Sequence, residues 1–257
     1  MTTDQFSVAD RTAIVTGGSS GIGRCVAEQF AADGAAVAIC SREQARVDPV
    51  AEVIEAAGGR ALAIECDVRD PDAVQGLVDA TVAEFGGLDA LVNNAGASFM
   101  ASFEDLSENA WKTIVDINLH GTFHGCQAAG AHMREHDGGV IVNVASIAGQ
   151  FGAAYMSHYG AAKAAVINLT RTLAYEWAGD DVRVNGVAPG FVATPGVASQ
   201  MGVTADDIDR SAVDRRVGTS EEIADLVQFL VSPASSYLVG ETVAAAGVPR
   251  LEHAPDR

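Results

Sequence analysis

The chain has 257 residues, of which 48% are hydrophobic, and it carries 34 acidic residues against 16 Lys and Arg residues, for a net charge of −18. This acidity excludes a nucleic-acid role, which needs basic patches, whereas the hydrophobic fraction allows a large core. No apolar run is long enough to span a bilayer, and the start Met1-Thr2-Thr3-Asp4 lacks the basic residues of a signal peptide.

Apolar segments alternate with helical patterns along the whole chain, which is typical of a parallel sheet covered by helices on both faces. No linker, repeat or low-complexity tract interrupts the alternation, so residues 1–257 are expected to form one α/β domain. The predicted strands are Thr12–Thr16, Ala36–Cys40, Ala61–Glu65, Ala90–Asn93, Val140–Val144, Arg183–Ala188 and Thr242–Ala245. The predicted helices are Gly21–Ala32, Pro49–Ala57, Pro71–Phe85, Glu108–Met133, Tyr155–Trp177 and Ser220–Leu230.

A glycine-rich turn joins the first strand to the first helix, in the order Thr16-Gly17-Gly18-Ser19-Ser20-Gly21-Ile22-Gly23. Glycines let the backbone approach a pyrophosphate closely, and a helix N-terminus supplies N–H donors and a positive dipole end. Such a cluster can also be an ordinary tight turn. Its place at the first strand-to-helix turn of an alternating chain favours phosphate binding.

Tyr159 and Lys163 are four residues apart, so they lie one above the other on a helix face. A neighbouring ammonium favours the phenolate and is expected to lower the pKa of the phenol from about 10. The phenol could then exchange a proton with a hydroxyl or carbonyl. Alone, this spacing more often indicates a surface pair.

With these motifs in this order, the chain resembles the short-chain dehydrogenase/reductase family over nearly its whole length. The resemblance rests on the glycine-rich turn, on Cys66-Asp67-Val68, on Asn93-Asn94-Ala95-Gly96, on Asn118, Ser146, Tyr159 and Lys163, and on Pro189-Gly190 followed by Thr194. It implies a Rossmann-type doubly wound fold with a seven-stranded parallel sheet. Within the family, the chain looks most similar to 3-oxoacyl-thioester reductases.

The resemblance also implies the role of each catalytic residue. Tyr159 would be the general acid in reduction, Lys163 would lower its pKa and hold the nicotinamide ribose, Ser146 would bind the substrate oxygen, and Asn118 would hold a proton-relaying water. Ser146 could instead only cap a turn, and Asn118 could only bend its helix. The implied cofactor contacts are Thr16, Gly17, Ser19, Ser20, Gly21, Ile22, Gly23, Ser41, Arg42, Asp67, Val68, Asn94, Ala95, Gly96, Tyr159, Lys163, Pro189, Gly190, Val192 and Thr194.

The second strand ends at Ser41-Arg42, where NAD-preferring relatives place an acidic residue that binds the ribose 2′-hydroxyl. The planar guanidinium of arginine suits a 2′-phosphate instead. NADP(H) is therefore the expected cofactor, although a solvated Arg42 would leave NAD(H) acceptable as well.

The substrate is expected to be a small-molecule carbonyl or secondary alcohol, held under a lid at about 191–217. The leading candidate is a 3-oxoacyl thioester in its CoA form, because a chain of this net charge would repel an acidic carrier protein. A sugar or secondary-alcohol dehydrogenase and a non-catalytic cofactor-binding sensor remain as alternatives. Residues expected to line the substrate site are Phe99, Met100, Phe151, Tyr155, Met156, Phe191, Val192, Val197 and Met201.

Assembly, compartment and metal content are further expectations. A cytoplasmic homotetramer, or a homodimer, is expected to pack through the 108–133 and 155–177 helices, although the segment after Thr242-Val243 departs from the family pattern. The four cysteines lack C-x-x-C spacing, which favours reduced thiols. His120 with His124, and His132 with His136, have metal-ligand spacing but no H-E-x-x-H motif, so no metal is expected.

The surface charge has two readings. Lysine is nearly absent, since the chain contains only Lys112 and Lys163. The acidic excess is consistent with a salt-adapted cytoplasm, in which salt screens the repulsion. It is equally typical of an arginine-using protein from a GC-rich genome.

Overall fold

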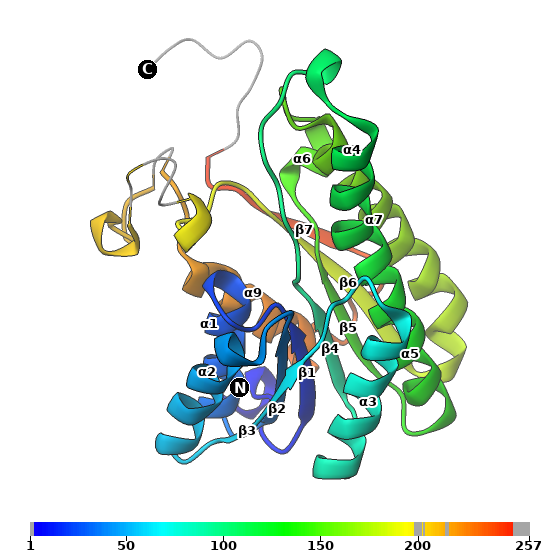
Figure 1. Cartoon of the computed structure of the whole chain (residues 1–257). Coiled ribbons are helices and arrows are strands. Elements are labelled where there is room, and N and C mark those ends of the chain that lie inside the picture. Colours follow the sequence, from blue (N-terminus) through cyan, green and yellow to red (C-terminus); the bar gives the residue numbers. More distant parts are fainter. Residues whose placement is uncertain (1–2, 198–201, 203, 214–215, 249–257) are drawn as a thin grey trace.

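A computed structural model of the chain describes residues 3–197, 202, 204–213 and 216–248. Its centre is a seven-stranded parallel sheet in the order β3-β2-β1-β4-β5-β6-β7 (Figure 1). The direction of winding reverses between β1 and β4, where ligands bind in open α/β sheets. The strands are β1 (Thr12–Thr16), β2 (Ala36–Ser41), β3 (Arg60–Glu65), β4 (Ala90–Asn93), β5 (Gly139–Val144), β6 (Val182–Pro189) and β7 (Thr242–Ala245).

Helices cover both faces of this sheet, because successive strand residues point to opposite sides. Alternate residues of β1 show the division, since Val15 packs in the core cluster of one face and Ile14 in that of the other. The first face is covered by α1 (Gly21–Ala32), α2 (Gln44–Ala56) and α9 (Ser220–Val231), and the second by α3 (Pro71–Phe85), α5 (Gly121–Glu135) and α7 (Ser157–Trp177). The predicted doubly wound, single-domain fold is confirmed.

The predicted Glu108–Met133 helix is divided into three parts. Helix α4 (Glu108–Val115) is followed by a turn of π-helix at Asp116–His120 and then by α5. The amide of Asn118 donates to Ile114 O at 2.9 Å and to Ala97 O at 2.7 Å. The side chain thus binds a carbonyl of its own helix and one of the β4–α4 connection, and such π-turns are frequent at functional sites.

Other helices also differ from the prediction, most clearly at the starts of α2 and α7 and in one additional helix. Helix α2 begins at Gln44, ahead of the predicted Pro49, because Gln44 is tied to β3 by hydrogen bonds from its backbone N–H to Glu65 and from its side chain to Ala63 O. Pro49 therefore lies inside the helix and removes one hydrogen bond. A short helix not predicted, α6 (Ile147–Phe151), follows β5, and α7 begins at Ser157 because Tyr155 has a φ of 64°.

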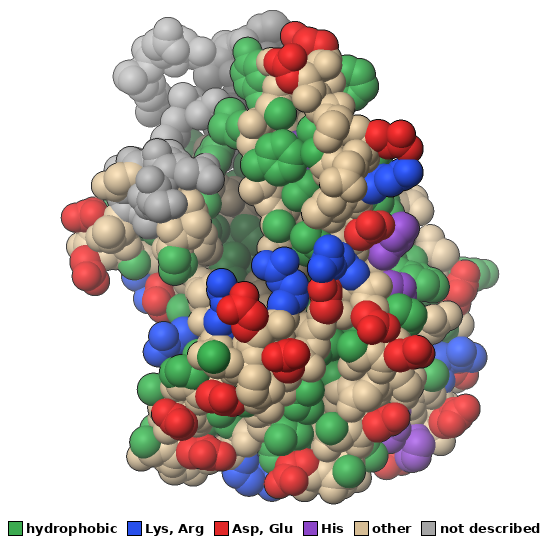
Figure 2. Space-filling view, viewed as in Figure 1, with side chains coloured by type: hydrophobic (Ala, Val, Ile, Leu, Met, Phe, Trp, Pro, Cys, Tyr) green, Lys and Arg blue, Asp and Glu red, His purple; other side chains and the backbone are tan. Residues whose placement is uncertain are grey.

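The carboxyl ends of the strands open onto a hollow on the face shown in Figure 2. Basic side chains gather in the middle of this face, although most of the charges around them are acidic. In the described part of the chain, no helix combines the length and the apolar composition that crossing a bilayer requires.

Candidate functional site

The glycine-rich turn after β1 is held in place by residues that follow β4. The side chain of Asn94 donates to Thr16 O at 2.9 Å and to Gly17 O at 3.2 Å, and Thr16 Oγ1 accepts from the backbone N–H groups of Asn94 and Ala95, both at 3.0 Å. Gly17 has a φ of +66°, and a Cβ there would lie 2.9 Å from Ala95 Cα. Only glycine fits this approach, so the two predicted motifs form one structure.

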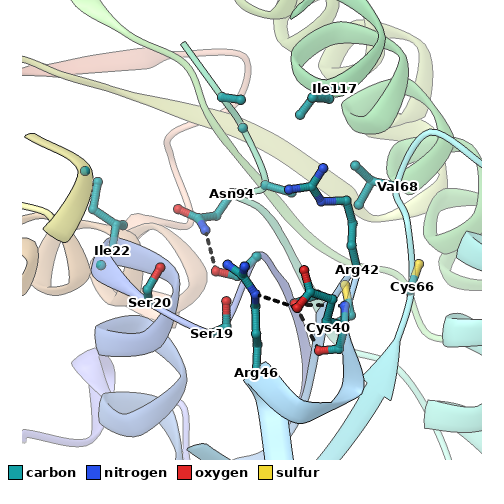
Figure 3. A pocket seen from close by; sticks show the side chains of 18 of the residues that line it. Ser19, Ser20, Ile22, Cys40, Arg42, Arg46, Cys66, Val68, Asn94 and Ile117 are labelled. Atoms are coloured by element: carbon teal, nitrogen blue, oxygen red, sulfur yellow. Dashed lines mark hydrogen bonds and ion pairs between the residues drawn. The ribbon is translucent and has the colours of Figure 1, made fainter. Parts of the chain in front are cut away.

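This structure borders a cavity of about 300 Å³ at the carboxyl ends of β1 to β4 (Figure 3). The cavity lies where the strand order reverses, and the N-terminus of α1 opens into it. Its lining residues are Gly17, Ser19, Ser20, Gly21, Ile22, Cys40, Ser41, Arg42, Glu43, Arg46, Cys66, Asp67, Val68, Asn94, Ala95, Gly96, Ala97, Ile117, Thr194, Pro195 and Gly196. Backbone N–H groups at a helix N-terminus and a glycine turn fit a dinucleotide pyrophosphate.

Most of the residues predicted to contact a cofactor line this cavity, and the others lie beside it. Thr16 and Gly23 help to fix the conformation of the glycine-rich turn. A Cβ on Gly23 would lie 2.4 Å from the Asn94 amide nitrogen. Pro189 and Gly190 end β6 beside β7, and Gly190 N donates to Ala245 O at 2.9 Å. Val192 forms a bridge with Gly218. Tyr159 and Lys163 are also outside the lining set.

Charged side chains surround the end of the cavity beyond β2. Arg46 Nε pairs with Glu43 Oε2 at 3.1 Å, whereas Arg69 binds both oxygens of Asp67. The hydrogen bonds from Arg69 lower the pKa of Asp67. Arg42 has no ion pair within the described residues. Of these cavity residues, Arg42 is predicted from the sequence, whereas Glu43 and Arg46 are not, since neither belongs to a recognised motif.

The four predicted catalytic residues come from the turn between β5 and α6, from α7 and from the π-turn. Ser146 is the N-cap of α6, where its hydroxyl accepts from Ala148 N at 3.2 Å, and it also hydrogen-bonds the phenol of Tyr159. Burial raises the pKa of Tyr159, and the Ser146 hydrogen bond offsets part of that rise. The sequence predicted a lowered phenol pKa caused by Lys163. In this structure burial raises the pKa of the phenol instead, and the group that partly lowers it is Ser146, not Lys163.

Lys163 is buried beneath the tyrosine. Its Nζ donates to Val144 O at 2.7 Å and lies 5.7 Å from the centre of the Tyr159 ring. Burial lowers the pKa of the ammonium from 10.5 to about 8, because desolvation disfavours the charged form. The pKa of Lys163 thus comes near the physiological pH range, and no carboxylate among the described residues forms an ion pair with its ammonium.

Asn118 Oδ1 faces the same small space, and it is a buried acceptor without a hydrogen-bond partner. A Cβ on Gly96 would lie 2.8 Å from this oxygen and 3.7 Å from Lys163 Nζ. Asn118 Oδ1 and the Lys163 ammonium therefore both approach Gly96 closely, and a side chain in place of this glycine would crowd the Asn118 oxygen. The orphan oxygen, the ammonium and the glycine fit a hydroxylated ribose or a water, which is the chemistry expected here.

His158 was singled out in the sequence only as a neighbour of Tyr159, and it is fully buried with neither ring nitrogen hydrogen-bonded. Its ring makes an edge contact with Phe99, with 4.4 Å between centroids. Burial lowers its pKa, so the neutral form is favoured. The ring packs as an apolar group beneath the β4–α4 connection.

Apolar side chains are exposed around the catalytic residues. Tyr155 O accepts a hydrogen bond from Ala101 N at 2.9 Å, which joins the segment before α7 to the β4–α4 connection. The exposed residues on these segments and after β6 are Phe99, Met100, Phe103, Phe151, Tyr155 and Phe191. Among the residues expected to line the substrate site, Met201 lies outside the described residues, as does the end of the chain after Val248.

The histidine pairs have other partners in the structure. His120 Nδ1 pairs with Asp116 at 2.9 Å, His124 Nδ1 contacts Val68 O at 2.9 Å, and His132 stacks on His136. No group of three or more His, Cys, Asp or Glu side chains that could hold a metal is found within the described ranges.

Comparisons with known proteins show which family and which solved structures this chain is similar to. The family model described as short chain dehydrogenase matches residues 11–204. The chain is 41% identical to the short-chain reductase protein NovJ of Streptomyces niveus, with 96% of each chain covered. It is 43% identical to cis-4-hydroxycyclohexanecarboxylate dehydrogenase of Sinomonas cyclohexanicum, covering 93% of this chain and 96% of that protein. A solved structure of 7α-hydroxysteroid dehydrogenase with NADH and 7-oxo glycochenodeoxycholic acid superposes with a TM-score of 0.88 at 31% identity, covering 98% of this chain and 100% of the other.

Proposed function

This chain belongs to the short-chain dehydrogenase family and is an NAD(P)-dependent oxidoreductase, and on that premise we propose that it prefers NADP(H) and interconverts an apolar ketone and a secondary alcohol. The observation that carries the proposal is the meeting of Ser146, Tyr159, Lys163 and Asn118 beside the dinucleotide cavity. A pure cofactor sensor has no need of this set, which argues against the non-catalytic alternative.

Tyr159 donates the proton in reduction and accepts it in oxidation. Its raised pKa keeps the phenol protonated near neutral pH, so the residue is ready to act as an acid. Ser146 hydrogen-bonds the phenol and orients the substrate oxygen toward it. When bound, the nicotinamide supplies or accepts the hydride, and the protein contributes orientation and the proton.

Lys163 and Asn118 hold the groups on the other side of the tyrosine. The Lys163 ammonium is aimed toward Gly96 and is fixed by Val144 O. Asn118 Oδ1 offers an acceptor in the same space. Together they suit a ribose hydroxyl or a water that passes protons to the buried lysine, which is the relay that the family resemblance implies.

The NADP(H) preference is supported by the charges beyond β2. Arg42 lines the cavity and forms no ion pair in the described chain, although its charge helps to lower the pKa of Asp67, so its planar fork is available to a 2′-phosphate. No acidic residue occupies position 41 or 42, where a carboxylate would favour NAD(H).

The exposed apolar residues around the tyrosine support an apolar substrate. An acyl chain or an alicyclic ring would cover Phe99, Met100, Phe151 and Tyr155, whereas a sugar would leave them in contact with polar groups. The leading candidate is a 3-oxoacyl-CoA. The second is an alicyclic secondary alcohol, favoured by the name of the 43% identical relative that oxidises a hydroxycyclohexane acid.

We also infer a cytoplasmic homotetramer or homodimer that packs through α5 and α7. Phe123 on α5 and Tyr175 on α7 are exposed in the single chain, as an interface on these helices requires. The segment at 191–217 is the proposed lid, anchored at its ends by the Val192–Gly218 bridge and by Arg216, which binds Glu222.

The test is turnover by a Tyr159→Phe variant, assayed by NADPH absorbance with 3-oxoacyl-CoAs, alicyclic ketones and aldoses. The variant keeps the ring and loses the proton donor, so turnover is expected to fall by about 10²-fold or more, with cofactor binding retained. Tyr237→Phe, at a fully exposed tyrosine outside both the site and the proposed interface, is the control and keeps full activity. If Tyr159→Phe turns over substrate as fast as the wild type, the mechanism is refuted. If the wild type acts on aldoses alone, the proposal of an apolar substrate is refuted.

A further inference from the structure

A second arginine lies at the end of the cavity beyond β2, next to Arg42. Arg46 is the third residue of α2, and Glu43 is the N-cap residue of the same helix. Both line the cavity. Figure 3 shows the Arg42 and Arg46 side chains reaching into the pocket from the β2–α2 connection and from the first turn of the helix. Two guanidinium groups therefore approach the place where an adenosine ribose would meet β2.

We propose that Arg46 is a second binding residue for the 2′-phosphate of NADP(H), and that Glu43 competes with the phosphate for it. The inference rests on the proposed preference for NADP(H), which it deepens by naming the residues that set its strength. Arg42 would bind the phosphate from one side and Arg46 from the other.

The ion pair of Arg46 is one that a phosphate can replace. Arg46 Nε lies 3.1 Å from Glu43 Oε2, and the two side chains are 61% and 59% exposed. Exposed pairs of this kind contribute little to stability, and a guanidinium has five N–H donors, more than one carboxylate needs. A phosphate offers three acceptor oxygens and up to two charges against the single charge of the carboxylate.

Arg69, the third arginine near this site, is held more firmly by its carboxylate partner than Arg46 is. Arg69 binds both carboxylate oxygens of Asp67, with Nε 3.0 Å from each and Nη2 2.5 Å from Oδ2. This bidentate contact fixes its guanidinium in place. Arg69 also does not line the cavity, whereas Arg46 does. The partner exchange is therefore specific to Arg46.

The Arg46–Glu43 ion pair is expected to respond differently to NAD(H) and to NADP(H). In NAD(H) the ribose carries a hydroxyl, and the Arg46–Glu43 pair is left intact. In NADP(H) the phosphate draws Arg46 away and leaves the Glu43 carboxylate close to a like charge, which opposes binding. Glu43 thus holds the preference for NADP(H) below the level that two arginines alone would produce.

The experiment is calorimetric titration of the purified chain with adenosine 2′,5′-bisphosphate and with adenosine 5′-monophosphate, at fixed ionic strength. Arg46→Ala is expected to weaken bisphosphate binding about tenfold and to leave monophosphate binding unchanged, while Glu43→Gln strengthens bisphosphate binding severalfold. Arg46→Lys keeps the positive charge but lacks the planar fork, so its affinity for the bisphosphate is expected to lie between those of Arg46→Ala and the wild type. Arg24→Ala is the matched control, since Arg24 is an exposed helical arginine in an i,i+4 pair outside the cavity lining.

The outcomes separate the two proposals. In one outcome the wild type prefers the bisphosphate, Arg42→Ala abolishes that preference, and Arg46→Ala binds the bisphosphate as tightly as Arg24→Ala does. This outcome overturns the role of Arg46 and leaves the NADP(H) preference standing. Equal wild-type affinity for both nucleotides overturns the NADP(H) preference and this inference together. Bisphosphate binding weakened by Glu43→Gln contradicts the competition.

Discussion

Ser146 performs two tasks that the sequence presented as alternatives. Its hydroxyl oxygen accepts from Ala148 N as the N-cap of α6, and the same hydroxyl hydrogen-bonds Tyr159. A cap fixes the rotamer of the serine. The capping bond therefore positions the group that adjusts the phenol pKa, so the structural and the catalytic readings are the same arrangement.

The first prediction follows from that hydrogen bond. Because it lowers the pKa of Tyr159, Ser146→Ala is expected to raise that pKa further. Oxidation requires the phenolate, so its rate rises with pH up to the phenol pKa, and the rise should move to higher pH in the variant. Reduction requires the protonated phenol, and its alkaline decline should move in the same direction. The measurement is kcat/KM against pH in both directions.

A matched control separates this effect from loss of the cap. Ser107 caps α4 by accepting from Ala110 N at 3.1 Å, and no hydrogen bond to Tyr159 involves it. Ser107→Ala loses a comparable cap and should keep the wild-type pH profile. If kcat/KM of Ser146→Ala depends on pH as that of the wild type does, Ser146 positions Tyr159 without changing its pKa.

The sequence motifs selected the proposed catalytic set, but not the protonation behaviour of its members. Order and spacing along the chain were enough to select Ser146, Tyr159 and Lys163. The burial that raises one pKa and lowers the other depends on packing from β5 and α6, which no local pattern contains. Glu43 and Arg46 were missed for a related reason, because α2 begins five residues before the proline that was taken as its start.

At the scale of elements, a buried polar chain joins the central strands to the catalytic helix. Asn93 on β4 donates to Asn143 Oδ1 on β5, and Asn143 donates to Thr170 Oγ1 on α7, both at 2.9 Å. Thr170 in turn donates to Val166 O at 2.9 Å. The chain lies in the interior, with all of these side chains almost fully buried. It fixes the register of α7, which carries Tyr159 and Lys163, against the sheet.

The second prediction concerns the middle of this chain. Asn143→Ala leaves the Asn93 amide and the Thr170 hydroxyl short of a partner and opens a cavity, so the free energy of unfolding should fall by about 1–3 kcal/mol. Denaturant titration measures the change. Asn109→Ala, on the exposed surface of α4, is the control and should stay within about 0.5 kcal/mol of wild type. Equal stability of the two variants would show that the network contributes no net stabilisation.

Strands were easier to predict than helices in this chain. Each strand lies within one residue of its predicted bounds at either end, because a parallel strand buried on both faces is a continuous apolar run. Helix boundaries depend on tertiary contacts that periodicity does not include. The π-turn is an example, since it depends on the contact of Asn118 with Ala97 O across the site.

At the scale of the whole molecule, the acidic excess is spread over the surface and is only partly neutralised. The described salt bridges pair few of the 34 acids, and Lys163 is buried, which leaves Lys112 as the single lysine available to the surface. Unpaired like charges repel one another and destabilise the compact state. Dissolved salt screens this repulsion.

The third prediction is that KCl stabilises the fold. Raising KCl from 0.1 to 1 M shortens the screening length from about 10 to 3 Å, so the melting temperature should rise by at least 2–4 °C, about 1 kcal/mol for a chain of this size. A variant with Glu52→Gln, Glu55→Gln and Glu84→Gln removes three exposed carboxylates that no described salt bridge uses. It should gain less from the same salt, which distinguishes screening from a general salting-out effect. Equal melting temperatures in dilute and concentrated KCl would instead assign the acidity to composition alone, as expected of an arginine-using protein from a GC-rich genome.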